Sequence, residues 1–178
     1  RIGVEGPMAR NVDDRGLLLS VMAGFDPRDP LAIPDSGDQF AKIPECDFTG
    51  IRIGWTPDLG MLDVAKEVQE VCYRSLDALT ELGCHVEDKC PDMTGAMEVF
   101  RVLRGSYFAA GGTALLDSHG HLVKRTLAEN IQFGLQLTAS DLLQADQNRN
   151  IIYQRVAAYF KKFDFLAVYT NKFFLIKV

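Results

Sequence analysis

Ile51-Arg52-Ile53-Gly54-Trp55 is a short apolar stretch of the kind that forms a buried strand. His85-Val86-Glu87 is a candidate second strand, and between the two stretches apolar residues recur at helical spacing. The recurring positions are Val64, Val68, Val71, Cys72, Leu76, Leu79 and Leu82. Gly83 is expected to close this helix. A strand, a helix and a second strand in that order predict a βαβ unit with parallel strands.

Downstream of this unit, helical patterns continue to alternate with short strands. One helix is predicted from Met97 to Ala110, ending before Gly111-Gly112. Thr138-Ala139-Ser140-Asp141 has capping-box spacing and is expected to open a long helix through Phe163. Phe165-Leu166-Ala167-Val168 then predicts another strand. This alternation favours the α/β class.

Upstream of the unit, the pattern predicts one helix and a long connector. Asn11 can cap a helix whose first turn holds Asp13 and Asp14, where carboxylates favour the positive end of the helix dipole. Gly24 is a plausible stop. Residues 25–47 hold four prolines and several aspartates without a sustained period, which predicts an irregular connector.

Composition excludes several classes of function. The 178 residues are 47% hydrophobic and 24% charged, as in ordinary globular proteins. A net charge of −5 argues against a nucleic-acid partner. The sequence contains no run of 18 apolar residues, so no membrane span is expected. The first twenty residues also lack a signal-peptide layout. We therefore expect a cytoplasmic protein. Because the chain starts at Arg1 rather than Met, the sequence leaves open whether a segment precedes it.

Cysteine and histidine residues form no recognisable metal site. Cys46, Cys72, Cys84 and Cys90 contain no CxxC pair, so reduced structural thiols are expected, with a Cys84–Cys90 disulfide left open. His119-Gly120-His121 could share a metal ion, but zinc needs three or four ligands and no further partner has a familiar spacing. We therefore expect these histidines to be exposed in a loop, and we expect neither a metal ion nor a cofactor.

No catalytic motif stands out among the serines either. The serines at 20, 36, 75, 106, 118 and 140 occupy helix, cap or loop positions without an obvious partner base. Gly111-Gly112 could admit a ligand close to the backbone, although the end of a helix is the favoured interpretation.

The opening of the chain carries a family resemblance. Gly6-Pro7-Met8-Ala9-Arg10, followed by Asn11-Val12-Asp13-Asp14, closely resembles the segment just downstream of the nucleophile in the amidase-signature hydrolases. Weaker similarities follow in the expected order, at Asp47–Asp58, Cys84–Glu87, Ala128–Gly134, Leu137–Asp141 and Tyr159–Leu166. Together they cover most of residues 3–168.

The resemblance implies both a fold and a chemistry. The expected fold is part of an amidase-signature domain, with a mixed, mostly parallel central sheet flanked by helices on both faces. The expected reaction is hydrolysis of a carboxamide C–N bond by a Ser–cis-Ser–Lys triad. Members carry these residues upstream of the segment matching Gly6, so no catalytic residue is assigned in this chain. Residues 1–178 would form one partial amidase-signature domain.

The resemblance also implies supporting and substrate-binding residues. Gly6, Pro7 and Arg10 would shape the segment beside the nucleophile loop, and Asp14 would help to start the following helix. An ion pair or a carbonyl clamp is the alternative for Arg10.

Three aromatic residues, Tyr107, Phe108 and Phe133, are candidate substrate contacts on the acyl side of the pocket. Core packing is the alternative role for these aromatic residues.

Several alternatives remain open from the sequence. Residues 169–178 depart from the family pattern, and we expect the isolated chain to aggregate because its apolar faces and sheet edges would be uncovered. The expected partners are a small-molecule amide and the remainder of the amidase domain, with a homodimer left open. Two alternative functions remain. The chain could belong to the amidase-like component of a glutamine-dependent amidotransferase, or it could be a binding or scaffold module without catalytic activity.

Overall fold

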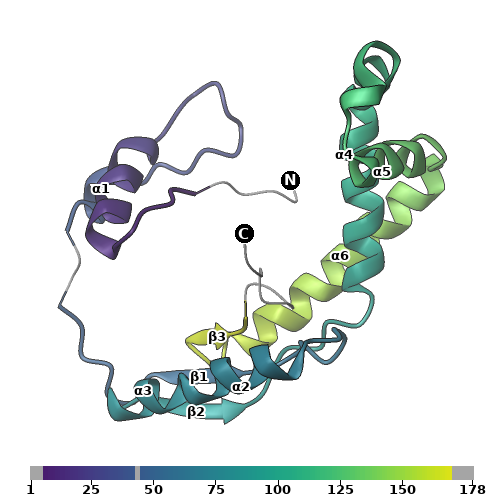
Figure 1. The fold of residues 1–178 in the computed structure, drawn as a ribbon. Helices are drawn as coiled ribbons and strands as arrows, with labels where there is room; N and C mark the ends of the chain where they lie inside the picture. The colour runs from purple at the N-terminus through teal and green to yellow at the C-terminus, as the bar shows by residue number, and fades with distance from the viewer. Residues whose placement is uncertain (1–5, 43–44, 170–178) are drawn as a thin grey trace. The chain divides into compact units, whose positions relative to one another are not determined.

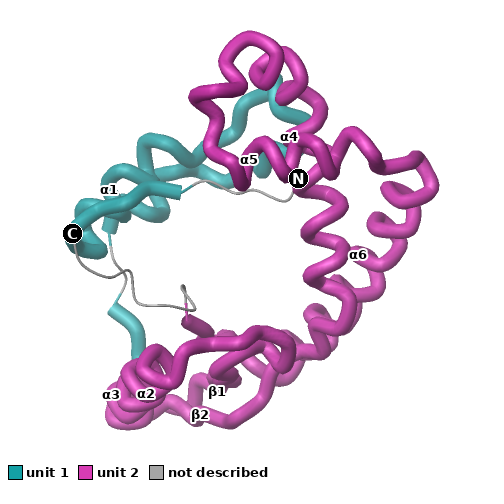
Figure 2. The backbone as a smooth tube through the Cα atoms, turned by 45° about the vertical axis from the view of Figure 1, so that its right-hand side comes forward, with its two compact units in different colours: residues 1–47 teal, residues 48–178 magenta. Residues whose placement is uncertain are grey.

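The computed structural model describes residues 6–42 and 45–169. They belong to two compact units, residues 1–47 and residues 48–178 (Figure 2). Most of the atypical tail, residues 170–178, lies outside the described residues.

The first unit contains the predicted N-terminal helix, α1 (Val12–Met22). Asn11 caps it: the Asn11 side-chain oxygen accepts a hydrogen bond from the backbone N–H of Asp14 at 2.8 Å, and the Asn11 amide donates to the Asp14 carboxylate at 2.9 Å. The helix ends before Gly24, as predicted. The connector contains one short 3₁₀ helix, η1 (Gly37–Phe40), which the sequence pattern did not predict.

Most of the apolar side chains of α1 are exposed. No residue of α1 is buried, and Leu17 and Val21 are 62% and 79% exposed. Helices in proteins are normally stabilised by packing of their apolar residues, and most of the apolar residues of α1 lack such packing here.

The second unit is built on a three-stranded parallel sheet (Figure 1). Its strands are β1 (Arg52–Trp55), β2 (His85–Asp88) and β3 (Phe165–Ala167), in the order β2-β1-β3. Ile53 of β1 pairs with Val86 on one side and with Phe165 on the other. All three predicted strands and the parallel pairing are confirmed.

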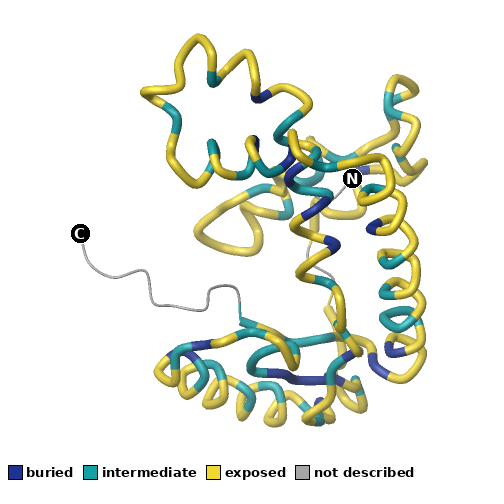
Figure 3. The backbone as a smooth tube through the Cα atoms, turned by 90° about the vertical axis from the view of Figure 1, so that its right-hand side faces the viewer, coloured by how far each residue is buried: buried dark blue, intermediate teal, exposed yellow. Residues whose placement is uncertain are grey.

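Helices cover both faces of this sheet. Successive residues of a strand point to opposite faces, so Ile53 and Trp55 share one face and Gly54 lies on the other. Trp55 lines a pocket with residues of α2 (Lys66–Arg74), which places α2 on the first face. The Tyr159 ring, at the end of α6 (Ala139–Tyr159), lies against Gly54 on the second face. Buried residues gather along β1 and recur along α4 (Figure 3).

The helix predicted between the first two strands is interrupted. It begins at Lys66 and continues after Ser75 as α3 (Leu76–Glu81). The Ser75 hydroxyl donates to the Val71 carbonyl at 3.1 Å, and such back-bonding tends to bend a helix. Gly83 then ends the segment with a φ of +92°, as the sequence predicted.

The prediction that a helix ends before Gly111-Gly112 is wrong. Helix α4 (Ala96–His119) continues through both glycines and is followed by η2 (Gly120–Leu122). Gly112 is buried because Ile131 of α5 (Arg125–Leu135) packs onto it: a Cβ at Gly112 would lie 2.6 Å from the Ile131 Cδ1. The glycine serves helix packing and not helix termination.

The predicted capping box of α6 is present. The Thr138 hydroxyl accepts from the Asp141 N–H at 3.2 Å, and the Thr138 N–H donates to the Asp141 carboxylate at 2.8 Å. The helix ends at Tyr159 instead of Phe163, because the chain turns there into β3. The Asp164 N–H donates to the Arg52 carbonyl at 2.8 Å, which starts the pairing of β3 with β1.

The capping box gives a prediction on pH. Its hydrogen bonds from Thr138 lower the pKa of Asp141. A lowered folded-state pKa contributes stability above the unfolded-state pKa of about 4, and this stability is lost as the pH falls through the folded-state pKa. We expect Thr138→Ala to raise the pKa of Asp141, as measured by an NMR pH titration. The control Thr80→Ala, in α3, should leave it unchanged, and a Thr138→Ala titration curve that overlays the wild type would contradict this assignment.

Two further expectations concerned a membrane-spanning helix and a disulfide. No helix among the described residues is both long and apolar enough to cross a bilayer. All four cysteines are free thiols, including Cys84 and Cys90, so the disulfide left open by the sequence is not formed.

Candidate functional site

The carboxyl ends of all three strands meet at one edge of the sheet. Ligands of open parallel sheets bind in the crevice outside this edge, so it is the first place to look for a site. A pocket of about 700 Å³ opens there. It is lined by Trp55, Pro57, Gln69, Glu70, Tyr73, Arg74 and Asp88.

The lining of this carboxyl-edge pocket is suited to binding. Trp55 is 6% exposed and supplies an apolar wall, while Glu70, Arg74 and Asp88 bring charges of both signs. Serine, cysteine and histidine are not among the lining residues, so these side chains offer no nucleophile with a partner base. The pocket can hold a small polar molecule, and a nucleophile would have to come from elsewhere.

A rigid turn follows β1 at the same edge. Thr56 is 3% exposed, and its hydroxyl accepts from the Leu59 N–H at 3.0 Å. The Asp58 carboxylate accepts from the Gly60 N–H at 2.6 Å, and Leu59 takes a left-handed φ of +55°. The Thr56 N–H donates to Ala167 at 3.3 Å, which fixes the turn to β3. Sequence analysis missed this turn, although Thr56-Pro57-Asp58 followed by Gly60 is a typical turn composition.

Tyr169 lies beside this turn, directly after β3. Burial, together with the negative charge of Asp58, raises the pKa of the Tyr169 phenol. Its hydroxyl is enclosed and has no hydrogen-bond partner among the residues that the structure describes.

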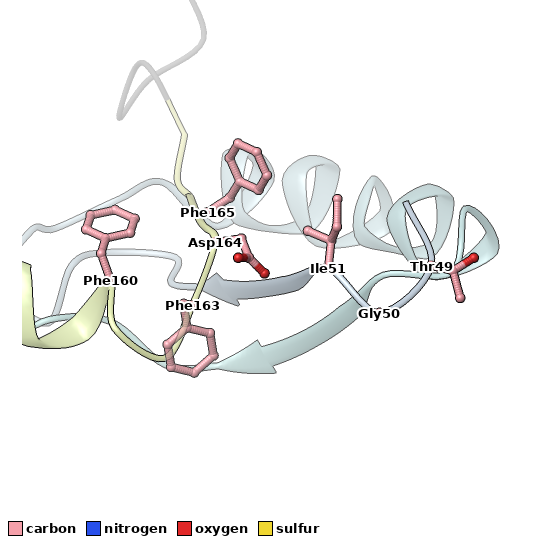
Figure 4. Close-up of a pocket in the computed structure, with 7 residues that line it drawn as sticks. All are labelled: Thr49, Gly50, Ile51, Phe160, Phe163, Asp164 and Phe165. Carbon is pink, nitrogen blue, oxygen red and sulfur yellow. The ribbon is translucent and has the colours of Figure 1, made fainter. Parts of the chain in front are cut away.

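A second pocket, of about 600 Å³, lies at the opposite, amino edge of the sheet (Figure 4). It is lined by Thr49, Gly50, Ile51, Phe160, Phe163, Asp164 and Phe165. In Figure 4 the rings of Phe160 and Phe165 rise on one side of the strands and that of Phe163 lies on the other. The Asp164 carboxylate accepts from the Arg52 N–H at 2.8 Å. The one acidic side chain that lines this pocket therefore holds two strands together.

Neither pocket contains the aromatic residues predicted to contact substrate. Tyr107 is 72% exposed and touches Phe108 edge-on, with ring centroids 5.7 Å apart. Phe133 packs against Gly105 of α4, and the Arg101 guanidinium lies over its ring at 4.1 Å. The structure thus places Phe133 in the contact between α4 and α5 and leaves Tyr107 in solvent. Their role in substrate binding stays a prediction.

Comparison with known proteins identifies the family. The model of the amidase family matches residues 1–172. The chain belongs to the amidase family. An acylamidase of Rhodococcus erythropolis is 38% identical over 86 residues, covering 48% of the chain and 18% of the relative. An amidase of Pseudomonas putida is 31% identical over 163 residues, covering 90% of the chain and 35% of the relative. The chain therefore spans about a third or less of these relatives.

Solved structures of amidase-signature enzymes share the fold. A bacterial aryl acylamidase of this family matches 92% of the chain with a TM-score of 0.72 at 22% identity, and 35% of that protein is covered. A 6-aminohexanoate cyclic dimer hydrolase complexed with substrate matches 86% of the chain with a TM-score of 0.66 at 19% identity, and 34% of that protein is covered. The expected fold class, a mostly parallel sheet flanked by helices, is confirmed.

The segment that first indicated the amidase family is described in part. Gly6 and Arg10 are exposed and Pro7 is half-buried. Asp14, in the first turn of α1, makes reciprocal hydrogen bonds with Asn11. That these residues support an active-site segment stays a prediction.

The histidine pair forms no metal site in the described part of the chain. His119 and His121 are exposed, and the His119 Nδ1 lies 2.8 Å from the Ser118 hydroxyl. The described residues contain no group of three or more potential ligands that could hold a metal ion.

Proposed function

We propose that the protein to which this chain belongs is an amidase that hydrolyses the C–N bond of small carboxamides in the cytoplasm. The observation that carries the proposal is the family match across residues 1–172. The fold shared with an aryl acylamidase and the 31% identity to a Pseudomonas putida amidase support it.

In this proposal the catalytic residues lie upstream of the chain. A lysine acts through a bridging serine to activate the serine nucleophile, and backbone N–H groups stabilise the oxyanion of the tetrahedral intermediate. Residues 1–178 would supply the scaffold, the carboxyl-edge pocket and the acyl-side contacts. Their partners would be the amide substrate and the rest of the amidase domain.

The test measures ammonia release by the intact protein from simple aliphatic and aromatic carboxamides. We expect turnover, with loss of activity when the upstream nucleophilic serine is replaced by alanine. A component of the glutamyl-tRNA(Gln) amidotransferase of Nitrosospira multiformis is 31% identical over 99 residues, covering 55% of the chain and 20% of that protein. Glutamine-dependent amidation of misacylated tRNA without turnover of simple amides would therefore replace this proposal, and no activity in either assay would favour a binding or scaffold role.

Tyr107 gives a clean test of the acyl-side contacts. Its side chain is 72% exposed in the described structure, so Tyr107→Ala should cost little folding stability. If the ring contacts substrate, we expect KM for an aromatic amide to rise about tenfold, because burial of an aromatic ring against a ligand contributes on the order of 1–2 kcal/mol.

The matched control for Tyr107 is Tyr153→Ala. Tyr153 is also 72% exposed but lies on α6. Equal KM values for the two variants would contradict a substrate role for Tyr107.

A further inference from the structure

The carboxyl-edge pocket sets a carboxylate beside an aromatic ring. Trp55 of β1 is in register with Asp88 of β2, and both residues line the pocket. Residues in register on neighbouring parallel strands lie about 4.8 Å apart and point to the same face of the sheet. Trp55 is 6% exposed, so its ring is held in place, whereas Asp88 is exposed at the end of its strand. One wall of the pocket therefore combines an indole ring with a negative charge.

The other wall comes from one side of α2. Four residues of this helix line the pocket at spacings of three and four positions: Gln69, Glu70, Tyr73 and Arg74. The side-chain amide of Gln69 donates to the Val64 carbonyl at 2.9 Å, and Arg74 Nε donates to the backbone carbonyl of Glu70 at 3.3 Å. Both side chains are thus tied to their own segment of the chain. The pocket volume of about 700 Å³ is in the range of small-molecule sites.

The charge of the lining favours a cation. Among the lining residues, the carboxylates of Glu70 and Asp88 outnumber the single guanidinium of Arg74. Lys66 and Lys89 are the nearest lysines in the sequence, and neither of them lines the pocket. The lining therefore carries a net negative charge, the same sign as that of the whole chain.

The aromatic rings favour an organic cation over a metal ion. Ca²⁺ and Mg²⁺ take about six or more oxygen ligands, and the described residues contain no group of three or more potential metal ligands. An alkylammonium ion needs only one carboxylate, to which its N–H groups donate charge-assisted hydrogen bonds, and it is also attracted to aromatic faces. Its methylene groups would lie against Trp55 and Tyr73. The pocket therefore fits a small protonated amine better than a metal ion or an anion.

We propose that the carboxyl-edge pocket binds an organic ammonium ion, with Asp88 and Glu70 as the partners of the charged group. The ammonium group belongs either to the amide substrate or to a separate amine, and both sources present the same chemistry to the pocket. Only the first source rests on the proposed amidase function, because binding of a free amine requires no turnover.

Calorimetric titration of the intact protein with n-pentylammonium tests the proposal. We expect binding by the wild type, and binding about ten- to hundredfold weaker in Asp88→Asn, as for loss of a hydrogen bond to a charged group. Asp77→Asn is the matched control: it removes an exposed carboxylate of α3 that does not line the pocket, and it should leave the affinity unchanged. Valerate, an anion of similar length, should bind more weakly than n-pentylammonium.

The proposal fails if the intact protein does not bind n-pentylammonium, the result expected where another part of the protein fills the pocket. It also fails if Asp88→Asn binds this ion as tightly as Asp77→Asn does, or if valerate binds equally well. If Asp88→Asn does not fold, Glu70→Gln takes its place, because Glu70 is an exposed residue of α2. An affinity unchanged in Glu70→Gln would then overturn the proposal.

A kinetic comparison identifies the source of the ammonium group. Valeramide and 5-aminovaleramide are amides of equal chain length that differ in a terminal ammonium group. If this group belongs to the substrate, Asp88→Asn lowers the ratio of kcat/KM for 5-aminovaleramide to that for valeramide about ten- to hundredfold, and Asp77→Asn does not. An unchanged ratio together with weaker n-pentylammonium binding assigns the pocket to a separate amine. If neither amide is hydrolysed, the amidase function fails, while the calorimetric result still decides this proposal.

Discussion

Gly134→Ala is expected to destabilise the second unit by about 3 kcal/mol or more, at the upper end of overpacking costs. Gly134 lies on α5 where this helix crosses α4, and a Cβ there would overlap the carbonyl group of Gly105. It would also lie 2.9 Å from the Ala109 Cβ. Most overpacked side chains can change rotamer, but a backbone carbonyl inside a helix cannot move without breaking that helix. The two helices would have to separate.

The control is Gly111→Ala, in the same helix pair. A Cβ at Gly111 meets no heavy atom within 4 Å, and the residue lies in the interior of α4. Because glycine is the poorer helix former, we expect this variant to be more stable by up to about 1 kcal/mol. Urea denaturation followed by circular dichroism would measure both changes. Equal stabilisation of the two variants would show that helix propensity, and not the crossing, governs these positions.

Gly54→Ala is expected to have an effect of similar size on the sheet, about 3 kcal/mol. Gly54 is the third of the four residues of β1, and the phenol of Tyr159 occupies the space that a Cβ would need. The Tyr159 Cζ would lie 2.8 Å from that Cβ and the Lys89 carbonyl oxygen 2.5 Å from it. The Tyr159 hydroxyl donates weakly to Lys89 and Phe165, at 3.4 Å each, so the ring is fixed from both sides.

A double-mutant cycle with Tyr159→Phe isolates this contact. Removing the hydroxyl opens part of the space over Gly54, so the cost of Gly54→Ala should fall by about 1 kcal/mol in the Tyr159→Phe background, the size of coupling typical for residues in contact. Thermal or urea denaturation of the four proteins gives the coupling energy. Additive effects would mean that strain in the strand, and not the phenol, sets the cost at Gly54.

Local signals explain why much of the fold could be predicted from the sequence. The caps at Asn11 and Thr138 involve residues three positions apart, β1 is a short apolar stretch, and β2 directly follows the end of a helical period. The glycines of α4 were misinterpreted because their role depends on a contact with another helix and not on a local signal. Gly112 looks like a helix end to any local rule, and only its contact with Ile131, from another helix, shows why it is a glycine.

The candidate site was harder to predict for the same physical reason. Phe133 was singled out as a candidate substrate contact, which stays a prediction, and its sequence neighbourhood does not reveal that Arg101 lies over its ring. The turn at Thr56 depends on a hydrogen bond to Ala167, more than a hundred residues away. The resemblance of the Gly6–Asp14 segment indicated the family, whereas the groups that meet in space depend on contacts between distant segments.

The position of β1 has a consequence for how the protein is made. Its neighbour β2 emerges from the ribosome soon after it, but its other neighbour, β3, is joined to it by contacts that span 112 residues, such as that of Arg52 with Asp164. Helices α4 and α5, which are close in sequence, can pair before β3 has been synthesised. During translation the nascent chain must therefore carry a half-finished sheet, with one side of β1 unpaired, through the whole helical region.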